Sequence, residues 1–178
     1  DADATLLAHA AQNTAALVHG KARFVQADLA EPAWLGALIK SPSGDEARSQ
    51  FDLVACFATL HHFPGYELRV QIVKALASLV ARDGVLILST WQFLTSARFV
   101  QKQIEWQTIG LTAADVEPGD ALLPWQQGGY AVRYVHQIDE DEMMRLAQDA
   151  GLTVVETFYA DGKEGNLNLY TVLATASA

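Results

Sequence analysis

Hydrophobic residues follow two kinds of spacing along the chain, and each predicts a different element. Two continuous apolar runs, FDLVACF at 51–57 and VLILSTW at 85–91, are typical of strands buried on both faces of a parallel sheet. Helical spacing marks three further stretches: 4–18, 66–82 and 139–150. Strand and helix therefore alternate over the first half of the chain, which predicts a parallel α/β sheet built from right-handed crossover units.

Turn and capping residues mark the ends of these elements. Asp3 can cap the first helix and Gly20 can end it, while a short strand is expected at 23–27, stopping at Asp28. Pro32 fits the first turn of a short helix, and the polar stretch 41–50 is typical of a surface loop. In the last predicted helix, Asp139 and Glu142 have the spacing of a capping box.

The regular pattern stops after residue 91. Residues 94–107 have a helical pattern, and the long stretch 108–137 looks irregular. Long irregular segments in compact domains are usually functional or disordered. This one is rich in Trp and Tyr, so we expect residues 92–137 to form an ordered lid or a substrate-binding insertion.

The chain ends in two β-rich runs, LTVVETFYA and NLNLYTVLATA, joined by the polar turn DGKEG. Such neighbours pair antiparallel. The whole pattern predicts an α/β fold: a Rossmann-like, doubly wound, mostly parallel sheet with a C-terminal antiparallel strand. One domain spanning residues 1–178 is expected.

Composition limits the function classes. The chain carries a formal charge of −9, which argues against a broad basic surface for nucleic acid but leaves a local patch open. Cys56 is the only cysteine, so neither an internal disulfide nor a cysteine-based zinc site is expected, and a cytoplasmic location fits. No apolar run is long enough to cross a membrane.

Several polar residues fall where predicted strands end, which is where ligands bind in open α/β sheets. Asp1 precedes the first helix, and a carboxylate there would suit the two hydroxyls of a ribose; a helix cap or a terminal residue without a role is the alternative. Asp28 could accept a hydrogen bond from an adenine amino group while Leu29 packs on the ring, or it could cap the next helix. Phe57 and Ala58 follow the apolar run FDLVAC, at the end of the strand predicted at 51–57.

Two adjacent histidines, His61 and His62, follow that same strand in CFATLHHFPG. On an extended chain they would point to opposite faces, so they make a poor metal site, and no metal is expected. The sequence also lacks the G-x-S-x-G elbow of a serine hydrolase. We expect one histidine to face a cleft and the other to pack or cap a turn.

The segment RYVHQ, 133–137, closes the irregular stretch. If it is extended, Arg133 and Val135 share one face while Tyr134 and His136 share the other. Arg133 and His136 could then hold an anionic group, since a guanidinium binds carboxylates in bidentate fashion. The alternative is a surface strand without a binding role.

Taken together, this layout resembles a class I S-adenosylmethionine-dependent methyltransferase. DADATLL resembles the segment whose acid binds the ribose of the cofactor, and VQADLAEP resembles the segment that contacts its adenine. The resemblance implies S-adenosylmethionine as cofactor. The residues implied to bind it are Asp1, Ala2, Asp28, Leu29, Phe57 and Ala58. The family's glycine-rich loop is expected upstream of Asp1, so the fold is expected to be N-terminally truncated here.

Within that class the chain is most similar to the wobble-uridine tRNA carboxymethyl methyltransferases. The shared motifs read, in order, ATLHHF, ELR at 67–69, Trp91, DALLPW at 120–125, RYVH at 133–136 and NLNLY at 166–170. The resemblance implies esterification of a carboxymethyl group on a tRNA uridine, with a small protein as partner. Arg133 and His136 would orient the acceptor carboxylate, with His61 nearby. A hydroxyl or amine acceptor would instead need His61 or His62 as a base.

Two alternatives stay open. The acidic surface favours a methyltransferase that acts on a small molecule. A non-catalytic methyltransferase-like subunit, which lends its surface to a partner, is the other.

Overall fold

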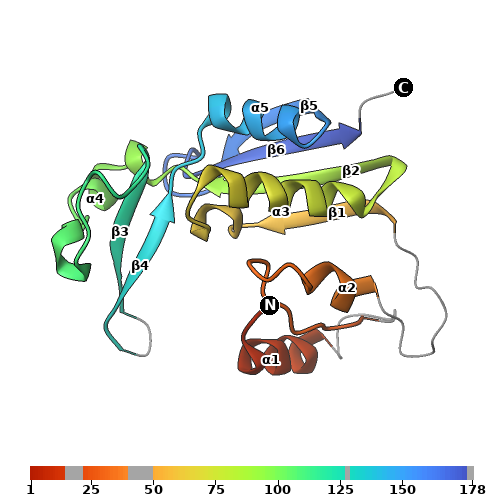
Figure 1. Cartoon of the computed structure of the whole chain (residues 1–178), viewed down its shortest axis with the longest axis horizontal. Coiled ribbons are helices and arrows are strands. Elements are labelled where there is room, and N and C mark those ends of the chain that lie inside the picture. The colour runs from red at the N-terminus through yellow and green to blue at the C-terminus, as the bar shows by residue number, and fades with distance from the viewer. Residues whose placement is uncertain (15–21, 40–49, 127–128, 176–178) are drawn as a thin grey trace. The chain divides into compact units, whose positions relative to one another are not determined.

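A computed structural model describes residues 1–14, 22–39, 50–126 and 129–175 (Figure 1). Within it the chain divides into two compact units, Asp1–Ser49 and Gln50–Ala178. The expectation of one domain over residues 1–178 stays a prediction. None of the described helices has the length and apolar character that crossing a bilayer requires.

The first unit contains two helices, α1 (Ala4–Thr14) and α2 (Trp34–Ile39). Asp3 caps α1 as predicted, because its Oδ1 accepts the backbone N–H groups of Thr5 at 2.7 Å and Leu6 at 3.1 Å. The predicted continuation of α1 to residue 18, its end at Gly20 and most of the loop at 41–50 lie outside the described residues.

The strand predicted at 23–27 is not formed, so that prediction was wrong. A strand exists only where a neighbouring strand takes its backbone hydrogen bonds. Within the described part of this unit, the segment instead makes a single backbone hydrogen bond to the start of the chain. The Ala27 N–H donates to the Asp1 carbonyl at 3.0 Å. The residue pattern of 23–27 is compatible with a strand, but no neighbouring strand pairs with it in the described part of this unit.

The second unit is built on a four-stranded sheet in the order β1 (Phe51–Phe57), β2 (Val80–Trp91), β6 (Asn168–Thr175) and β5 (Leu152–Ala160). The β1–β2 pair is parallel, whereas β6 runs antiparallel to both β2 and β5. The predicted C-terminal hairpin is therefore confirmed, and its second strand lies inside the sheet rather than at its edge.

Helices α3 (Tyr66–Ser78) and α5 (Glu140–Asp149) lie side by side on the same face of this sheet (Figure 1). They cover alternate residues of β2 and β6, including Leu86, Leu88 and Leu173, which are fully buried. Helix α3 is shorter than predicted and ends at Ser78, because β2 already begins at Val80.

A glycine allows β2 to start close to β1. A Cβ atom on Gly84 would lie 2.8 Å from the carbonyl oxygens of both Phe51 and Asp52, so only glycine fits against that backbone. Arg82, the last residue of the helix predicted at 66–82, and Gly84 are thus part of the strand.

Strand β1 is less buried than its apolar sequence predicts. Only Val54 and Cys56 are buried, while Phe51, Leu53 and Phe57 are exposed. The strand is an edge of the four-stranded sheet, and α3 and α5 cover only one of its faces. The prediction of burial on both faces was therefore wrong for β1 in this structure.

The segment between β2 and α5 is more regular than expected. It contains the antiparallel hairpin of β3 (Asp120–Trp125) and β4 (Ala131–His136), where an irregular stretch was predicted. The helix predicted at 94–107 is reduced to three short pieces: η2 (Phe93–Thr95), α4 (Ala97–Val100) and η3 (Trp106–Ile109). The hairpin packs through Ala121, Leu123 and Val135 on Phe93, and the role of residues 92–137 as a lid stays a prediction.

Candidate active site

The end of β1 is held against β2 by a strained residue. Ala58 has a positive φ of 49°, which is unusual for a residue other than glycine. Its backbone N–H donates to both the carbonyl and the Oγ of Ser89, at 3.2 and 3.0 Å. Strain of this kind clusters at ligand sites and lies here at the carboxyl end of a parallel strand, next to the exposed Phe57.

His61 follows on the short turn η1 (Leu60–His62) and is buried, with 2% of its surface exposed. Its Nδ1 accepts the backbone N–H of Trp91 at 3.2 Å, so the ring proton sits on Nε2. Burial, with smaller contributions from His62, Arg133 and His136, lowers the pKa of His61 to about 3. A neutral histidine with an occupied Nδ1 is a poor general base but a good support for Trp91.

His62 is the more accessible of the pair. Its Nδ1 lies 3.2 Å from the carbonyl of Tyr134, which can only accept, so Nδ1 carries the proton and Nε2 keeps a lone pair. Burial lowers the pKa of His62. The two rings lie 4.4 Å apart on a helical turn, so the expectation that they point to opposite faces of an extended chain was wrong.

Arg133, on β4, is held between two indole rings. Its guanidinium carbon lies 4.9 Å from the centre of the Trp91 ring and 4.8 Å from that of Trp125. The ion pairs among the described residues do not include Arg133, and its buried Nε has no hydrogen-bond partner there. Burial lowers the pKa of Arg133, although a guanidinium stays charged at neutral pH.

His136 lies on the face of β4 opposite to Arg133, and both of its ring nitrogens contact carboxylates. Its Nδ1 is 2.6 Å from Asp120 and its Nε2 is 2.8 Å from Glu142. Burial alone would lower the pKa of His136, but the hydrogen bonds to the two carboxylates outweigh it and raise the pKa to about 8. His136 is therefore a cation bound on both sides within the protein.

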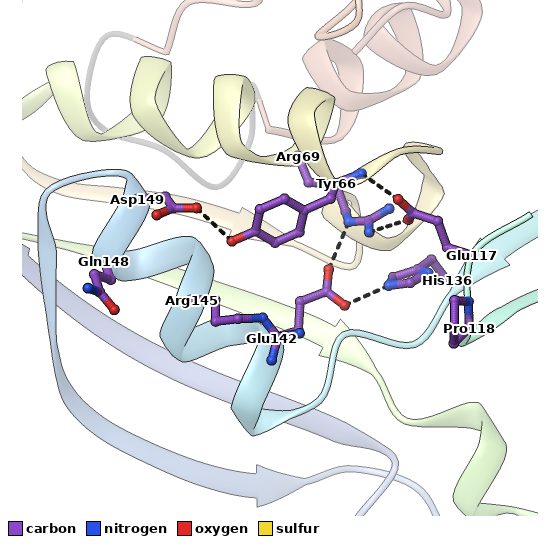
Figure 2. A pocket seen from close by; sticks show the side chains of 9 residues that line it. All are labelled: Tyr66, Arg69, Glu117, Pro118, His136, Glu142, Arg145, Gln148 and Asp149. Atoms are coloured by element: carbon purple, nitrogen blue, oxygen red, sulfur yellow. Dashed lines mark hydrogen bonds and ion pairs between the residues drawn. The ribbon is translucent and has the colours of Figure 1, made fainter.

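Glu142 and His136 belong to a polar network around Arg69, shown in Figure 2. Arg69, on α3, donates to Glu117 at 2.6 Å, to Glu142 at 2.9 Å and to the Phe63 carbonyl at 3.0 Å. Glu142 extends from α5 with one oxygen on Arg69 and the other on His136 (Figure 2). The network thus joins α3, β4 and α5 beside an open cavity of about 580 Å³.

Among the described residues, the side chains that could together hold a metal ion are Glu117, Asp120 and His136, whose ligand atoms lie within 4.8 Å of one another. Each already has protein partners: Arg69 for Glu117, and Tyr134 for Asp120, which also accepts from His136. The arrangement is that of a satisfied ion-pair network.

The residues expected to bind the cofactor fall in both units. In the first unit, Asp1 and Asp28 each accept a backbone N–H two residues further on, from Asp3 at 2.8 Å and from Ala30 at 2.9 Å. Both side chains are exposed, and their predicted contacts with ribose and adenine stay predictions. Leu29 is half-buried, and the Ala2 carbonyl accepts from the Gln26 side chain. Phe57 and Ala58 belong to the second unit, so a shared cofactor site stays a prediction.

Six residues of the ion-pair network and of the indole site around Arg133 were not predicted from the sequence to have a binding or catalytic role: Arg69, Trp91, Glu117, Asp120, Trp125 and Glu142. A signal for four of them was present, because Arg69, Trp91, Asp120 and Trp125 stand in the motifs quoted for the resemblance. Glu142 was identified only as part of a capping box. The sequence did not indicate that its carboxylate bridges two other elements.

A family-level comparison matches residues 7–157 to the methyltransferase domain. Among solved structures, an S-adenosylmethionine-dependent methyltransferase from Clostridium acetobutylicum is similar at a TM-score of 0.69 and 10% identity, over 99% of this chain and 74% of that one. A second, from Methanosarcina mazei, has a TM-score of 0.68 and 16% identity, over 100% and 81%. Magnesium protoporphyrin IX methyltransferase from Synechocystis, with bound S-adenosylmethionine, has a TM-score of 0.56 and 17% identity, over 99% and 57%.

At these identities the solved structures establish the fold, and they confirm the predicted Rossmann-like α/β architecture with its antiparallel C-terminal strand. No curated protein is similar enough in sequence to match.

Proposed function

The chain belongs to the family of the methyltransferase domain, and from that premise we propose that it transfers a methyl group to a carboxylate, forming a methyl ester. Family and fold confirm the enzyme class and the cofactor predicted from the sequence: an S-adenosylmethionine-dependent methyltransferase. The nature of the acceptor is the proposed part.

Arg133 carries this proposal. Its charge is half-buried between Trp91 and Trp125 and lacks an ion-pair partner among the described residues. A buried cation without an anion is costly, and a ligand carboxylate would supply the missing charge in the bidentate geometry that guanidinium favours. Trp91 also lies 6.1 Å from His61, which connects this cation to the end of β1.

The chemistry demands little from the protein beyond positioning. S-adenosylmethionine, when bound, supplies an electrophilic methyl group on a good leaving group. A carboxylate is already ionised at pH 7, so its oxygen can attack without a base. Arg133 would bind and orient that carboxylate. His61 holds the Trp91 backbone and so supports the ring under Arg133, while the indoles exclude water.

His136 receives a different role from the one first expected. Both of its ring nitrogens are occupied by Asp120 and Glu142. We therefore assign it to the positioning of β4, and through β4 of Arg133, rather than to contact with the acceptor.

For the identity of the acceptor, the motifs shared with wobble-uridine methyltransferases favour a carboxymethyl group on a tRNA uridine. The formal charge of −9 favours the second candidate, a small carboxylic acid. Both acceptors present a carboxylate to Arg133, so both would give an alkali-labile ester.

The test is methyl transfer by the full chain from S-adenosylmethionine labelled in the methyl group. Acceptors are tRNA carrying 5-carboxymethyluridine, the free nucleoside, and a panel of small carboxylic acids. Ester formation is measured as volatile methanol released by mild alkali. Label that resists alkali would place the methyl group on nitrogen, carbon or a hydroxyl oxygen and would overturn the ester proposal.

Substitution of Arg133 tests the anchor itself. Arg133→Ala should raise the KM for the acceptor at least about tenfold, because the bidentate guanidinium contact is lost. Arg133→Lys should raise the KM less, because an ammonium keeps the charge but cannot bind the carboxylate in bidentate fashion. Arg82→Ala, at an exposed position of β2, is the matched control. Calorimetric titration with S-adenosylhomocysteine should show unchanged affinity in all three variants. Equal losses of cofactor and acceptor binding would contradict the assignment.

A further inference from the structure

Positive charge gathers at one place on this acidic chain. Two adjoining cavities, of about 360 and 490 Å³, share Arg98 and Phe99 as a common wall. Lys102 and Arg133 line the first cavity, and Lys163 lines the second. We call these cavities together the cationic groove.

The charge balance of this groove is opposite to that of the whole chain. Its lining includes four cations, Arg98, Lys102, Arg133 and Lys163, and among the described residues a single acid, Glu164, so four minus one leaves a net charge of +3. The chain as a whole carries −9. Such a local reversal of sign attracts an anion at close range even though the overall field repels it.

None of the four cations is neutralised within the described part of the chain. The cations that form ion pairs there are Arg69 and His136. The cations also come from separate segments: α4 and the turn after it, β4, and the turn between β5 and β6. Folding brings them together against their mutual repulsion, and a ligand that carries several negative charges would offset that cost.

Flat aromatic surface accompanies these charges. Phe99 lines both cavities and has the Arg98 guanidinium 5.2 Å above its ring, and the half-exposed Trp125 stacks on Arg133. Lysines and arginines interleaved with aromatic rings are the features that bind phosphates and stack bases. A simple dicarboxylate would use the charges but leave the rings unused.

From these observations we propose that the cationic groove binds phosphate groups of the acceptor molecule. The inference rests on the proposed function in one respect: the acceptor carboxylate occupies Arg133, and its phosphates extend past Arg98 towards Lys102 and Lys163. Phosphates of this kind come from a free nucleotide or from a polynucleotide strand, and the groove chemistry is the same for both.

The test is equilibrium binding to the full chain without cofactor. The probes are a fluorescein-labelled single-stranded RNA 12-mer, followed by anisotropy, and uridine monophosphate and inorganic phosphate as competitors. The double variant Arg98→Ala/Lys102→Ala should raise the Kd for the RNA about tenfold or more. Lys163→Ala should raise it less, and each lost contact should reduce the slope of log K against log salt by about 0.7. Lys74→Ala, an exposed lysine on α3 outside the groove, is the matched control.

The outcomes separate the two sources of phosphate. RNA binding far tighter than that of the monophosphate, with the loss confined to groove variants, identifies a polynucleotide. Equal affinity for the two probes, lost in the same variants, identifies a nucleotide. Identical Kd values for the groove variants, the control and the unchanged protein overturn the proposal. Because this assay involves no methyl transfer, its failure leaves the ester proposal standing, and failure of ester formation leaves the binding result intact.

Discussion

Trp91 connects the two groups that matter most in the proposed site. Its backbone N–H donates to His61, and its ring carries Arg133 on one side and meets Phe99 edge-on at 4.6 Å. Because His61 is buried and neutral, its contribution is to fix Trp91 rather than to move a proton. At the scale of single residues, the function of this histidine is therefore structural support for a binding surface.

Substitution of His61 should show this. His61→Ala leaves the Trp91 N–H without its acceptor and opens a cavity, so we expect a loss of about 2–4 kcal/mol in the free energy of unfolding. His61→Asn can offer its Oδ1 to the same N–H and should recover about 1 kcal/mol of that loss. Chemical denaturation measures both.

Ester formation gives the second readout for His61. We expect a flat profile of kcat against pH between 6 and 8 in both the unchanged protein and the Asn variant, because no base takes part. A profile in the unchanged protein that rises through a pKa in this range and disappears in the Asn variant would contradict the supporting role and restore His61 as a base.

At the scale of elements, Glu142 has two structural roles, and the sequence indicated only the one within its own helix. Asp139 caps α5 through a 2.8 Å hydrogen bond from the Glu142 N–H, as the capping-box pattern predicts. The Glu142 carboxylate, however, bridges Arg69 on α3 and His136 on β4. Glu142 thus takes part in the N-terminal cap of α5 and also ties this helix to two other elements, including the strand that carries Arg133.

Glu142→Gln should therefore destabilise the protein more than the loss of a helix cap would. The variant keeps the shape of the side chain but removes the charge that faces two buried cations, so we expect a loss of about 3 kcal/mol in stability. Glu140→Gln, an exposed acid in the same helical turn, is the control and should change stability by less than about 0.5 kcal/mol. Urea unfolding of both variants compares them directly, and equal costs would show that the bridge contributes nothing beyond the cap.

Elements whose signal lies within one stretch of sequence could be predicted, and elements that depend on a distant partner could not. The runs 51–57 and 85–91 became β1 and the core of β2 because continuous apolar residues favour strands wherever they pair. The shorter segment 23–27 was also predicted as a strand but forms none, and β3 was missed because its pairing with β4 is visible only in the fold. Likewise, Arg133 and His136 were found from their motif, but their opposite environments depend on Trp91, Asp120 and Glu142, far away in sequence.

At the scale of the whole molecule, two buried histidines set opposite limits on stability. The pKa of His61 is about 3 in the folded state, below its ordinary value of 6.5, so its stabilising effect is present above pH 6.5 and lost as pH falls below it. The pKa of His136 is raised to about 8, so its effect is fully present below pH 6.5 and lost as pH rises through 8. Stability should therefore be greatest near pH 6.5 and decline on both sides.

Thermal unfolding between pH 5 and 9 measures this optimum. His136→Gln should flatten the decline on the basic side, which we expect to be about 1 kcal/mol after allowance for solvent screening. His61→Asn should flatten the part of the acidic decline above pH 5, since the acids Glu117 and Asp120, whose pKa values are lowered by their partners against burial, act at lower pH. His9→Gln, in an exposed position on α1, should leave the profile unchanged. A basic decline that persists in His136→Gln would mean that His136 is not the cation that holds β4 to α5, and the positioning role assigned to it would fall with that result.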